Sequence, residues 1–558
     1  MTHYCKWKYE ENEKGKGIER KETSMKNLFK KIGALLMAAV MVLSMCTAVF
    51  ATNDPMVADH ATIKGINKED GITVKAYKII TYNENGTYSE VLENTIDKTE
   101  DGTLNPTSAN IEALAKRTND LTDVVNITDR DDEGVYTTSA LTPGTWMIIV
   151  TGSNTALYNP AIISVKMDTD GKYKYGTLDF STDTWNDNGT VYMKKSEPEI
   201  KKTAETVVAG NDIKGTQYGD IIKFTITADV PSYESSKDSI QYSIEDTLDG
   251  LSLVNKDTYV PSATIDGKKD ATLTAAVEKA IVDGNTSFTV NDLGDEWIIA
   301  HRGGKIVITY YAKVTSDAQL NIDLNTNTAK LTYSTNDKVQ SKTSKTKHYT
   351  FGIDTSVVGT TETGTPNKTG EFVKINQNGE VGYDEKTGEV TKTTETELLS
   401  GAEFQLHNIG KPDGELFTDA RGNSTFTTDA SGKLEINGLD SDVVYYLVET
   451  KAPTGYKLVS TPIEVKINAS FEGDTLTGYD VVIGGKTTHY EYNENAGTVK
   501  LVNDKDHPSN PYGFKNTKIS ELPSTGGMGT YLFTIIGVVV MAVAAGAFFI
   551  SRRRGSEE

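Results

Sequence analysis

The sequence predicts an all-β protein built of tandem β-sandwich domains, with a membrane-spanning helix close to its C-terminal end. The body is rich in Thr, Val, Ile and Tyr, and clusters of Gly, Asn and Asp separate short runs of alternating polarity, which is typical of sandwich strands. The 558 residues allow about three domains of ordinary size. Residues 531–550 are apolar and uncharged and precede three arginines, so they are expected to span the membrane with a cytoplasmic tail.

Residues 1–51 are expected to be a leader rather than part of a fold. Residues 25–31 are basic, residues 32–49 are apolar, and Ala51 ends a small-residue cleavage site, which together predict a secretory signal peptide over residues 25–51. Residues 1–24 are highly charged and precede an otherwise ordinary signal peptide. We therefore expect Met25 to be the true start.

Composition excludes several classes of function. The two cysteines, Cys5 and Cys46, both lie in the leader, so the mature protein has no disulfide and no thiolate metal site. The formal net charge of −21 argues against a nucleic-acid partner. The acidic run 129–134 starts like a calcium loop, but Ala140 stands where the loop needs its final Glu, so a solvated loop is expected. No metal and no cofactor are predicted.

A short motif precedes the predicted membrane helix. It consists of Leu522, Pro523, Ser524, Thr525 and Gly526. With the apolar run and the basic tail, residues 521–558 resemble the cell-wall sorting signal of Gram-positive surface proteins. The resemblance implies that a sortase thiol cleaves between Thr525 and Gly526 and transfers the Thr carbonyl to an amine.

The first predicted domain, residues 52–195, ends in a second recognisable motif. Strands are expected at residues 72–80, 146–150 and 161–166, and a short helix at 109–116. The end of the domain carries Trp185 and then Val191, Tyr192, Met193, Lys194 and Lys195. This stretch resembles the pilin motif of Gram-positive pilus backbone subunits, which implies that Lys194 is the acceptor lysine. Met193 replaces the usual Pro and Lys195 an often-found Asn, so Lys195 remains an alternative.

The second predicted domain, residues 196–349, places three polar residues on core faces. Strand parity turns Lys202, Asp246 and Asn327 inward, and Asn325 has the same parity as Asn327. A buried lysine, acid and asparagine suit an intramolecular isopeptide bond, because burial favours a neutral amine and a protonated acid. A Lys–Asp ion pair would satisfy the same parity. The segments resemble the second domain of backbone pilins, which implies a Lys202–Asn327 bond helped by Asp246, with Asn325 as the alternative.

The third predicted domain, residues 350–520, follows a linker near residues 355–369. Its segments 400–406 and 445–456 contain Gly-Ala-x-Phe and Glu-Thr-Lys-Ala-Pro. They resemble the collagen-binding B-type, transthyretin-like sandwich. The resemblance implies Lys374 as nucleophile, Glu449 as acid and Asn516 as the bonded amide, with Asn503 as the alternative. The first domain offers Thr151 where a helper acid would stand, so no internal bond is expected there.

Taken together, these motifs resemble the major shaft subunit of a sortase-assembled pilus over the whole mature chain. The resemblance implies tandem immunoglobulin-like and transthyretin-like sandwiches, and a substrate of sortase rather than an enzyme, apart from single-turnover bond formation on itself. Implied partners are a pilus-specific class C sortase, identical subunits joined head to tail, minor tip and basal pilins, and cell-wall peptidoglycan, with host matrix or mucosal ligands as further candidates. The alternative is a monomeric wall-anchored adhesin that binds host matrix proteins.

Overall fold

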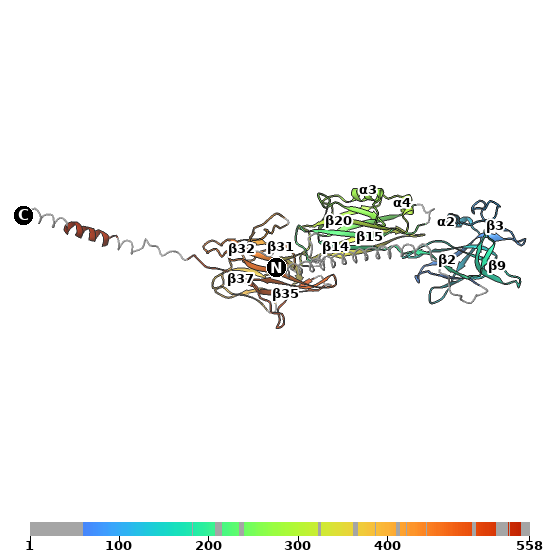
Figure 1. The fold of residues 1–558 in the computed structure, drawn as a ribbon. Helices are drawn as coiled ribbons and strands as arrows, with labels where there is room; N and C mark the ends of the chain where they lie inside the picture. The colour runs from blue at the N-terminus through green and yellow to red at the C-terminus, as the bar shows by residue number, and fades with distance from the viewer. Residues whose placement is uncertain are drawn as a thin grey trace, which may run out of the picture.

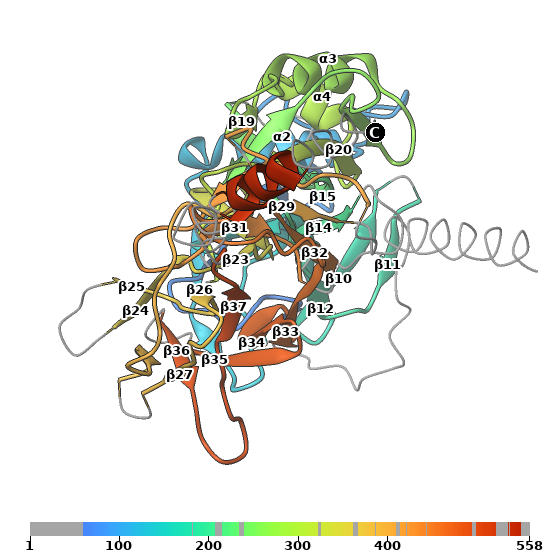
Figure 2. The same cartoon turned by 90° about the vertical axis from the view of Figure 1, so that its left-hand side faces the viewer.

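The computed structural model describes residues 60–519, together with 534 and 536–547. Within the first range it does not describe 181, 207–214, 234–238, 322–324, 361–365, 385–386, 409–412, 420, 442 and 494–497. The predicted signal peptide and the motif at residues 522–526 lie outside the described residues. Three strand-rich bodies follow one another along a single axis (Figure 1) and overlap when viewed down it (Figure 2), and this confirms the all-β prediction.

The first domain combines two main sheets with one helix. Its helix α2 (Ser108–Ala115), close to the predicted 109–116, is capped by Thr107, whose side chain accepts a hydrogen bond from the Asn110 amide. A 3-10 turn η1 (Thr118–Asp120) follows. The strands are β1 (Thr62–Lys64), β2 (Thr73–Tyr82), β3 (Tyr88–Glu90), β4 (Val124–Ile127), β5 (Asp129–Arg130), β6 (Tyr136–Thr137), β7 (Gly144–Thr151), β8 (Leu157–Tyr158), β9 (Ala161–Met167), β10 (Tyr173–Asp179), β11 (Thr184–Asn186), β12 (Thr190–Tyr192) and β13 (Lys195–Ser196).

The topology of the first domain brings its two ends together. One sheet has the order β11-β10-β9-β7-β2-β3, with β4 also on β2, and the other has the order β12-β1-β6-β5. Strand β1 pairs in parallel with β12, with Ile63 opposite Val191. The segment that carries the predicted pilin motif is therefore held at a sheet edge.

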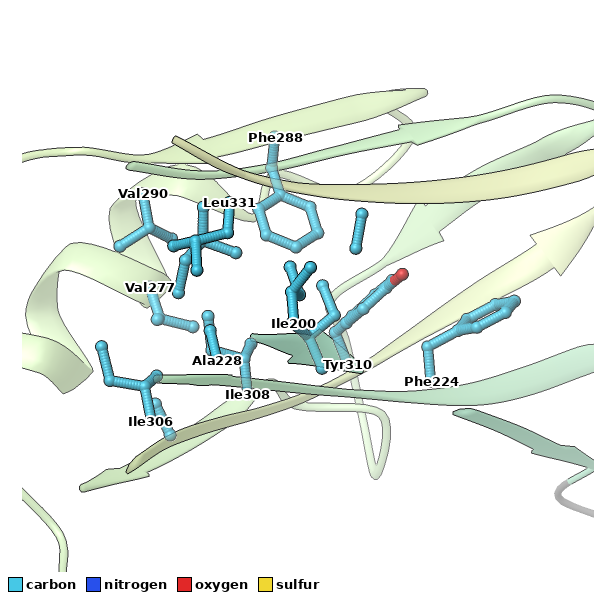
Figure 3. Packing of buried hydrophobic residues seen from close by; sticks show 14 of the residues in the cluster. Ile200, Phe224, Ala228, Val277, Phe288, Val290, Ile306, Ile308, Tyr310 and Leu331 are labelled. Atoms are coloured by element: carbon cyan, nitrogen blue, oxygen red, sulfur yellow. The ribbon is translucent and has the colours of Figure 1, made fainter. Parts of the chain in front are cut away.

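The second domain is a sandwich of two antiparallel sheets. Its elements are β14 (Ile200–Thr206), β15 (Ile221–Asp229), β16 (Tyr242–Leu248), β17 (Leu251–Val254), β18 (Ser262–Ile265), α3 (Ala271–Ala280), β19 (Ser287–Val290), α4 (Asp295–Ala300), β20 (Lys305–Val314), β21 (Thr326–Ser334) and β22 (Val339–Lys347). One sheet has the order β14-β15-β20-β17, with β18 on β20, and the other has the order β19-β16-β21-β22. Alternate residues of β15 and β20 are buried, as a one-sided strand requires. Phe288, Tyr310 and Leu331 pack between the layers (Figure 3).

The third domain is a second sandwich, with a core from Tyr349 to Phe514. Its strands are β23 (Phe351–Ile353), β24 (Ser356–Thr360), β25 (Pro366–Lys368), β26 (Phe372–Asn376), β27 (Val381–Tyr383), β28 (Val390–Lys392), β29 (Glu403–His407), β30 (Phe426–Thr427), β31 (Ile436–Leu439), β32 (Val444–Lys451), β33 (Ile463–Glu472), β34 (Thr475–Ile483), β35 (Lys486–Asn493), β36 (Thr498–Val502) and β37 (Tyr512–Asn516). The large sheet has the order β30-β29-β32-β33-β34-β35-β36, while β26 and β37 form a parallel pair.

Both domain junctions are packed and hydrogen bonded. Leu157 of the first domain belongs to the hydrophobic core of the second. At the same junction the Asn336 side chain donates to the Tyr158 carbonyl at 3.0 Å. At the other junction, the Tyr218 amide donates to the Gly438 carbonyl at 2.9 Å, and the Lys347 amine donates to the Thr475 hydroxyl at 3.2 Å. These contacts join the three domains into a row.

The C-terminal end carries helical residues 536–547, whose large apolar side chains are exposed. Across the part of the chain that the structure describes, no helix combines the length and the hydropathy needed to span a membrane. The predicted span of residues 531–550 extends beyond the described helical residues on both sides.

Candidate functional site

Three buried polar side chains meet in the interior of the second domain. Lys202 lies on β14, Asp246 on β16 and Asn327 on β21, and each is at most 5% exposed. Strand β14 belongs to one sheet, whereas β16 and β21 are neighbours in the other. The cluster therefore connects the two layers of the sandwich, at the inward positions that strand parity predicts.

The lysine amine of this cluster already touches both of its expected partners. Nζ of Lys202 donates to Oδ1 of Asp246 and, at 2.6 Å, to Oδ1 of Asn327. The side chains of Lys202 and Asp246 have no exposed area. Because the amine touches the carbonyl oxygen of Asn327, a small displacement brings it onto the adjacent carbonyl carbon.

Burial moves the pKa values of the two ionisable groups toward each other. Desolvation lowers the pKa of Lys202 to about 8, against the opposing effect of Asp246. Desolvation also raises the pKa of Asp246 to about 6, although the charge of Lys202 lowers it. Proton transfer from the ammonium to the carboxylate therefore costs much less free energy than it does between the unperturbed groups. The cluster can thus form a neutral amine and an acid.

The third domain contains a second cluster of the same composition. Lys374 on β26, Glu449 on β32 and Asn516 on β37 are at most 1% exposed. Nζ of Lys374 lies 3.2 Å from Oε1 of Glu449. Nδ2 of Asn516 donates to both carboxylate oxygens, at 3.1 and 3.0 Å. The acid therefore bridges the attacking nitrogen and the nitrogen that would leave.

The surroundings of Lys374 favour its neutral form. Desolvation lowers the pKa of Lys374 to about 8. Oδ1 of Asn516 is buried and has no hydrogen-bond partner among the described residues. Attack at this amide carbonyl would therefore break no hydrogen bond to its oxygen. Since β26 and β37 are parallel neighbours, the cluster joins a strand in the first part of the domain to its last described strand.

The two alternative asparagines make other contacts. Asn325 is buried, but its side chain accepts from the Gln319 amide and donates to the Gln319 carbonyl, both at 2.7 Å. Asn503 follows β36 and accepts from the Ser509 amide at 3.1 Å. The structure therefore brings Asn327 and Asn516, rather than these two, to the buried lysines.

Lys194 lies on the surface directly after β12. Val191 and Met193 are buried, whereas Tyr192 and Lys194 are exposed, so alternation turns the lysine outward. The Lys194 carbonyl accepts from the Asn159 amide at 3.0 Å, which holds its backbone. Among the described residues its amine forms no hydrogen bond or ion pair. It is therefore available to a reaction partner.

The alternative acceptor, Lys195, is engaged by its neighbours. Its amine donates to Oδ1 of Asn67 and forms an ion pair with Glu197, with 3.0 Å between Nζ and Oε1. A nucleophilic role for Lys195 would require these contacts to break. The geometry favours Lys194.

Met193, which departs from the usual pilin motif, has its own structural role. Its amide donates to the Lys64 carbonyl at 2.9 Å and so extends the pairing between β1 and β12, which a proline could not do. Gly65 adopts φ +87°, and a β-carbon there would lie 3.0 Å from the Met193 carbonyl oxygen. The motif is thus fixed closely against the start of the domain.

The first domain lacks a cluster of the same kind among its described residues. Its buried Lys78 donates to the Thr142 hydroxyl at 2.5 Å and pairs with Asp123 at 3.3 Å, but the Asp123 side chain is 59% exposed. In the predicted acidic loop, Asp131 accepts from the backbone amides of Glu133 and Val135. No group of three or more His, Cys, Asp or Glu residues in the described ranges is placed to bind a metal.

One member of the first cluster was not predicted from sequence. Tyr310 on β20 places its hydroxyl within hydrogen-bond distance of Lys202, Asp246 and Asn327. Alternation in β20 shows that Tyr310 faces inward. Parity alone does not reveal that its hydroxyl reaches across to the opposite sheet.

Comparisons with known proteins agree with these features. Residues 386–479 match a prealbumin-like fold domain, and residues 515–557 match the LPXTG cell wall anchor motif. The chain is 26% identical to the trypsin-resistant surface T6 protein of Streptococcus pyogenes serotype M6, over 89% of this chain and 95% of that protein. It is 25% identical to the type 1 fimbrial subunit of Actinomyces viscosus, over 67% of each.

A solved structure supports the same fold. The T6 backbone pilin of S. pyogenes serotype M6, described as a modular three-domain structure, aligns with a TM-score of 0.53 and 19% identity. The alignment covers 84% of this chain and all of that one. The fold and the anchor motif together define this protein as a multidomain, cell-wall-anchored surface protein of a Gram-positive bacterium. The recognition of the chain as a relative of sortase-assembled major pilins is confirmed.

Proposed function

We propose that this protein is the major subunit of a surface pilus in which sortase joins Thr525 of one subunit to Lys194 of the next. The observation that carries this proposal is the exposed amine of Lys194, which has no partner among the described residues and follows a strand fixed at the domain edge. The anchor motif at the other end of the chain supplies the second reactant. Because the linked surfaces differ, the contact does not close and a filament grows.

Internal isopeptide bonds are the second part of the proposal. The buried clusters support a bond from Lys202 to Asn327 with Asp246 as helper, and one from Lys374 to Asn516 with Glu449 as helper. In each bond the amine replaces the amide nitrogen of asparagine, and ammonia leaves. The relative from S. pyogenes is described as trypsin-resistant, which suits a chain with such cross-links. No cofactor takes part.

The domain boundaries at residues 52–195, 196–349 and 350–520 belong to the same proposal. The buried hydrophobic clusters support them to within a residue, because the core of the second domain draws on residues 200–333 plus Leu157, and that of the third on residues 349–514. Each predicted internal bond then lies within one domain. A pilus-specific class C sortase and minor tip and basal pilins are the proposed partners beyond identical subunits.

Replacing Lys194 with alanine tests polymerisation. We expect the ladder of high-mass species from cell walls boiled in detergent to disappear, while monomer stays on the surface because its anchor motif is intact. Lys195→Ala is the matched control and should retain the ladder. If ladders persist in the double variant Lys194→Ala/Lys195→Ala, this acceptor site is wrong and the subunits are joined through another amine.

The intact mass of the full chain tests the internal bonds. Processed wild-type chain should be lighter than its sequence mass by two molecules of ammonia. Asp246→Ala and Glu449→Ala should each restore one, since the amine then lacks its proton acceptor. Glu245→Ala, on the same strand as Asp246 but paired with Lys330 at the surface, should leave the wild-type mass deficit unchanged. A wild-type chain of full sequence mass would rule out both bonds.

A further inference from the structure

The Tyr310 hydroxyl lies at the centre of the cluster in the second domain. It accepts from Nζ of Lys202 at 2.7 Å and from Nδ2 of Asn327 at 2.8 Å, and it donates to Oδ2 of Asp246. Under the proposed chemistry, these two nitrogens are the one that attacks and the one that leaves. A single phenol oxygen thus touches both nitrogens and the helper acid.

The environment holds this phenol in place and in its protonated form. Its ring stacks on Phe224 with a centroid distance of 5.3 Å and meets Phe288 edge-on at 5.1 Å. These aromatic rings form part of the core between the two sheets, and the hydroxyl of Tyr310 is the polar atom drawn among them (Figure 3). Burial and the neighbouring Asp246 raise the pKa of Tyr310 well above its ordinary value. The group is therefore a proton donor at any physiological pH.

We propose that Tyr310 is a catalytic residue of bond formation in the second domain, acting as a proton relay between Lys202 and the leaving nitrogen of Asn327. This rests on the proposed Lys202–Asn327 bond. Asp246 first takes one proton from Nζ, and the neutral amine attacks the amide carbon. Tyr310 then gives its proton to Nδ2, its oxygen takes the second proton from Nζ, and the carbon–nitrogen bond to Nδ2 breaks. The products are one secondary amide, one ammonia, a protonated Asp246 and an unchanged phenol.

The acid of the third domain contacts the two reacting nitrogens differently from the acid of the second. There, Nδ2 of Asn516 donates to Glu449 itself, and the same carboxylate lies beside Nζ of Lys374. A glutamate thus contacts both nitrogens. In the second domain the acid is an aspartate, one methylene shorter, and Nδ2 of Asn327 donates to the phenol at 2.8 Å in addition to its side-chain hydrogen bond with Asp246. The phenol thus adds a second group, beside the shorter acid, that contacts both nitrogens.

A pulse–chase experiment on the full chain tests the relay, and the rate of bond formation in the third domain serves as the internal reference. Labelled chains are quenched in acid at successive times and digested, and the branched peptides containing Lys202–Asn327 and Lys374–Asn516 are quantified. In Tyr310→Phe we expect the half-time of the first bond to lengthen about tenfold or more, as loss of general acid–base catalysis requires, while that of the second bond is unchanged.

Two further variants separate catalysis from packing. Phe288→Leu disturbs the same aromatic contact but keeps the phenol, so bond formation should stay near the wild-type rate. Tyr310→Phe/Asp246→Glu recreates the arrangement of the third domain and should recover part of the lost rate, which a purely structural role of Tyr310 would not allow.

Each outcome decides the inference. An unchanged half-time in Tyr310→Phe overturns it, as does equal slowing in Phe288→Leu without recovery in the double variant. If wild-type chains yield no Lys202–Asn327 peptide at all, the proposed bond itself fails, and the relay with it. If wild-type chains form that bond and only Tyr310→Phe is slow, both proposals stand.

Discussion

At the scale of single residues, burial away from the solvent is what turns ordinary side chains into reactants. Lys202 and Lys374 would be inert ammonium ions at the surface, but desolvation lowers the pKa of each to about 8. Desolvation raises the pKa of Asp246 at the same time. Proton transfer from the lysine to the acid then costs little free energy and yields a nucleophilic amine, and the fold holds this amine next to the asparagine amide carbon.

These pKa values predict a bell-shaped pH dependence for bond formation in the second domain. Below about pH 6 both Asp246 and Lys202 are protonated, so no acceptor remains and no neutral amine forms. Above about pH 8 the pair has lost the shared proton, so Asp246 stays ionised and cannot donate a hydrogen bond within the cluster while Tyr310 relays its proton. The rate should therefore be greatest between these values and fall about tenfold per pH unit outside them.

The measurement uses unlinked full chain, collected in denaturant and refolded across a pH series. The amount of branched Lys202–Asn327 peptide is followed over time. A rate that rises steadily from pH 5 to pH 10 would contradict the shared-proton account, because it would require only the free amine.

At the scale of strands, each proposed bond joins segments that are far apart in the chain. The bond from Lys202 to Asn327 would close a loop of 125 residues and tie β14 in one sheet to β21 in the other. The bond in the third domain would lock the parallel pair of β26 and β37. Tension applied at the ends of a domain would then meet a covalent link before it reached the hydrogen bonds between strands.

Removing the bond in the second domain should cost substantial stability. By the entropy of closing so long a loop, Asn327→Ala should lower the free energy of unfolding by about 5 kcal/mol, and the Tm of this domain by on the order of 10–20 °C. Asn325→Ala is the matched control: it removes the hydrogen bonds to Gln319 but keeps the cross-link, and should cost only about 1–2 kcal/mol. Calorimetry of the full chain measures both. Equal losses in the two variants would mean that no cross-link contributes.

The sequence predicted the strands better than the contacts between them. Alternation predicted the strands near residues 72–80, 146–150 and 161–166, which are β2, β7 and β9. It also predicted that Lys202, Asp246 and Asn327 face inward. It did not separate Asn327 from Asn325, because residues two apart share a face, and only the pairing of β16 with β21 places one of them at the lysine. The role of Tyr310 was missed because the sequence does not give the distance between the two sheets, which decides whether its hydroxyl reaches the cluster.

At the scale of the whole molecule, the domains form a row whose junctions contain both apolar and polar contacts. Leu157 inserts into the core of the second domain, and the Tyr218 amide donates to the Gly438 carbonyl at the next junction. Figure 1 shows the third domain at one end of the row and the first domain at the other. Joining the chain end that follows the third domain of one copy to Lys194, next to the first junction of the following copy, would extend a fibre along the row.

The most direct test of the central claim is mass spectrometry of peptides from pilus material released from the producing cell wall. The account predicts a branched peptide in which the carbonyl of Thr525 is bonded to Nζ of Lys194. Finding Thr525 attached only to peptidoglycan, with Lys194 unmodified in every recovered peptide, would contradict it and identify the protein as a monomeric wall-anchored surface protein.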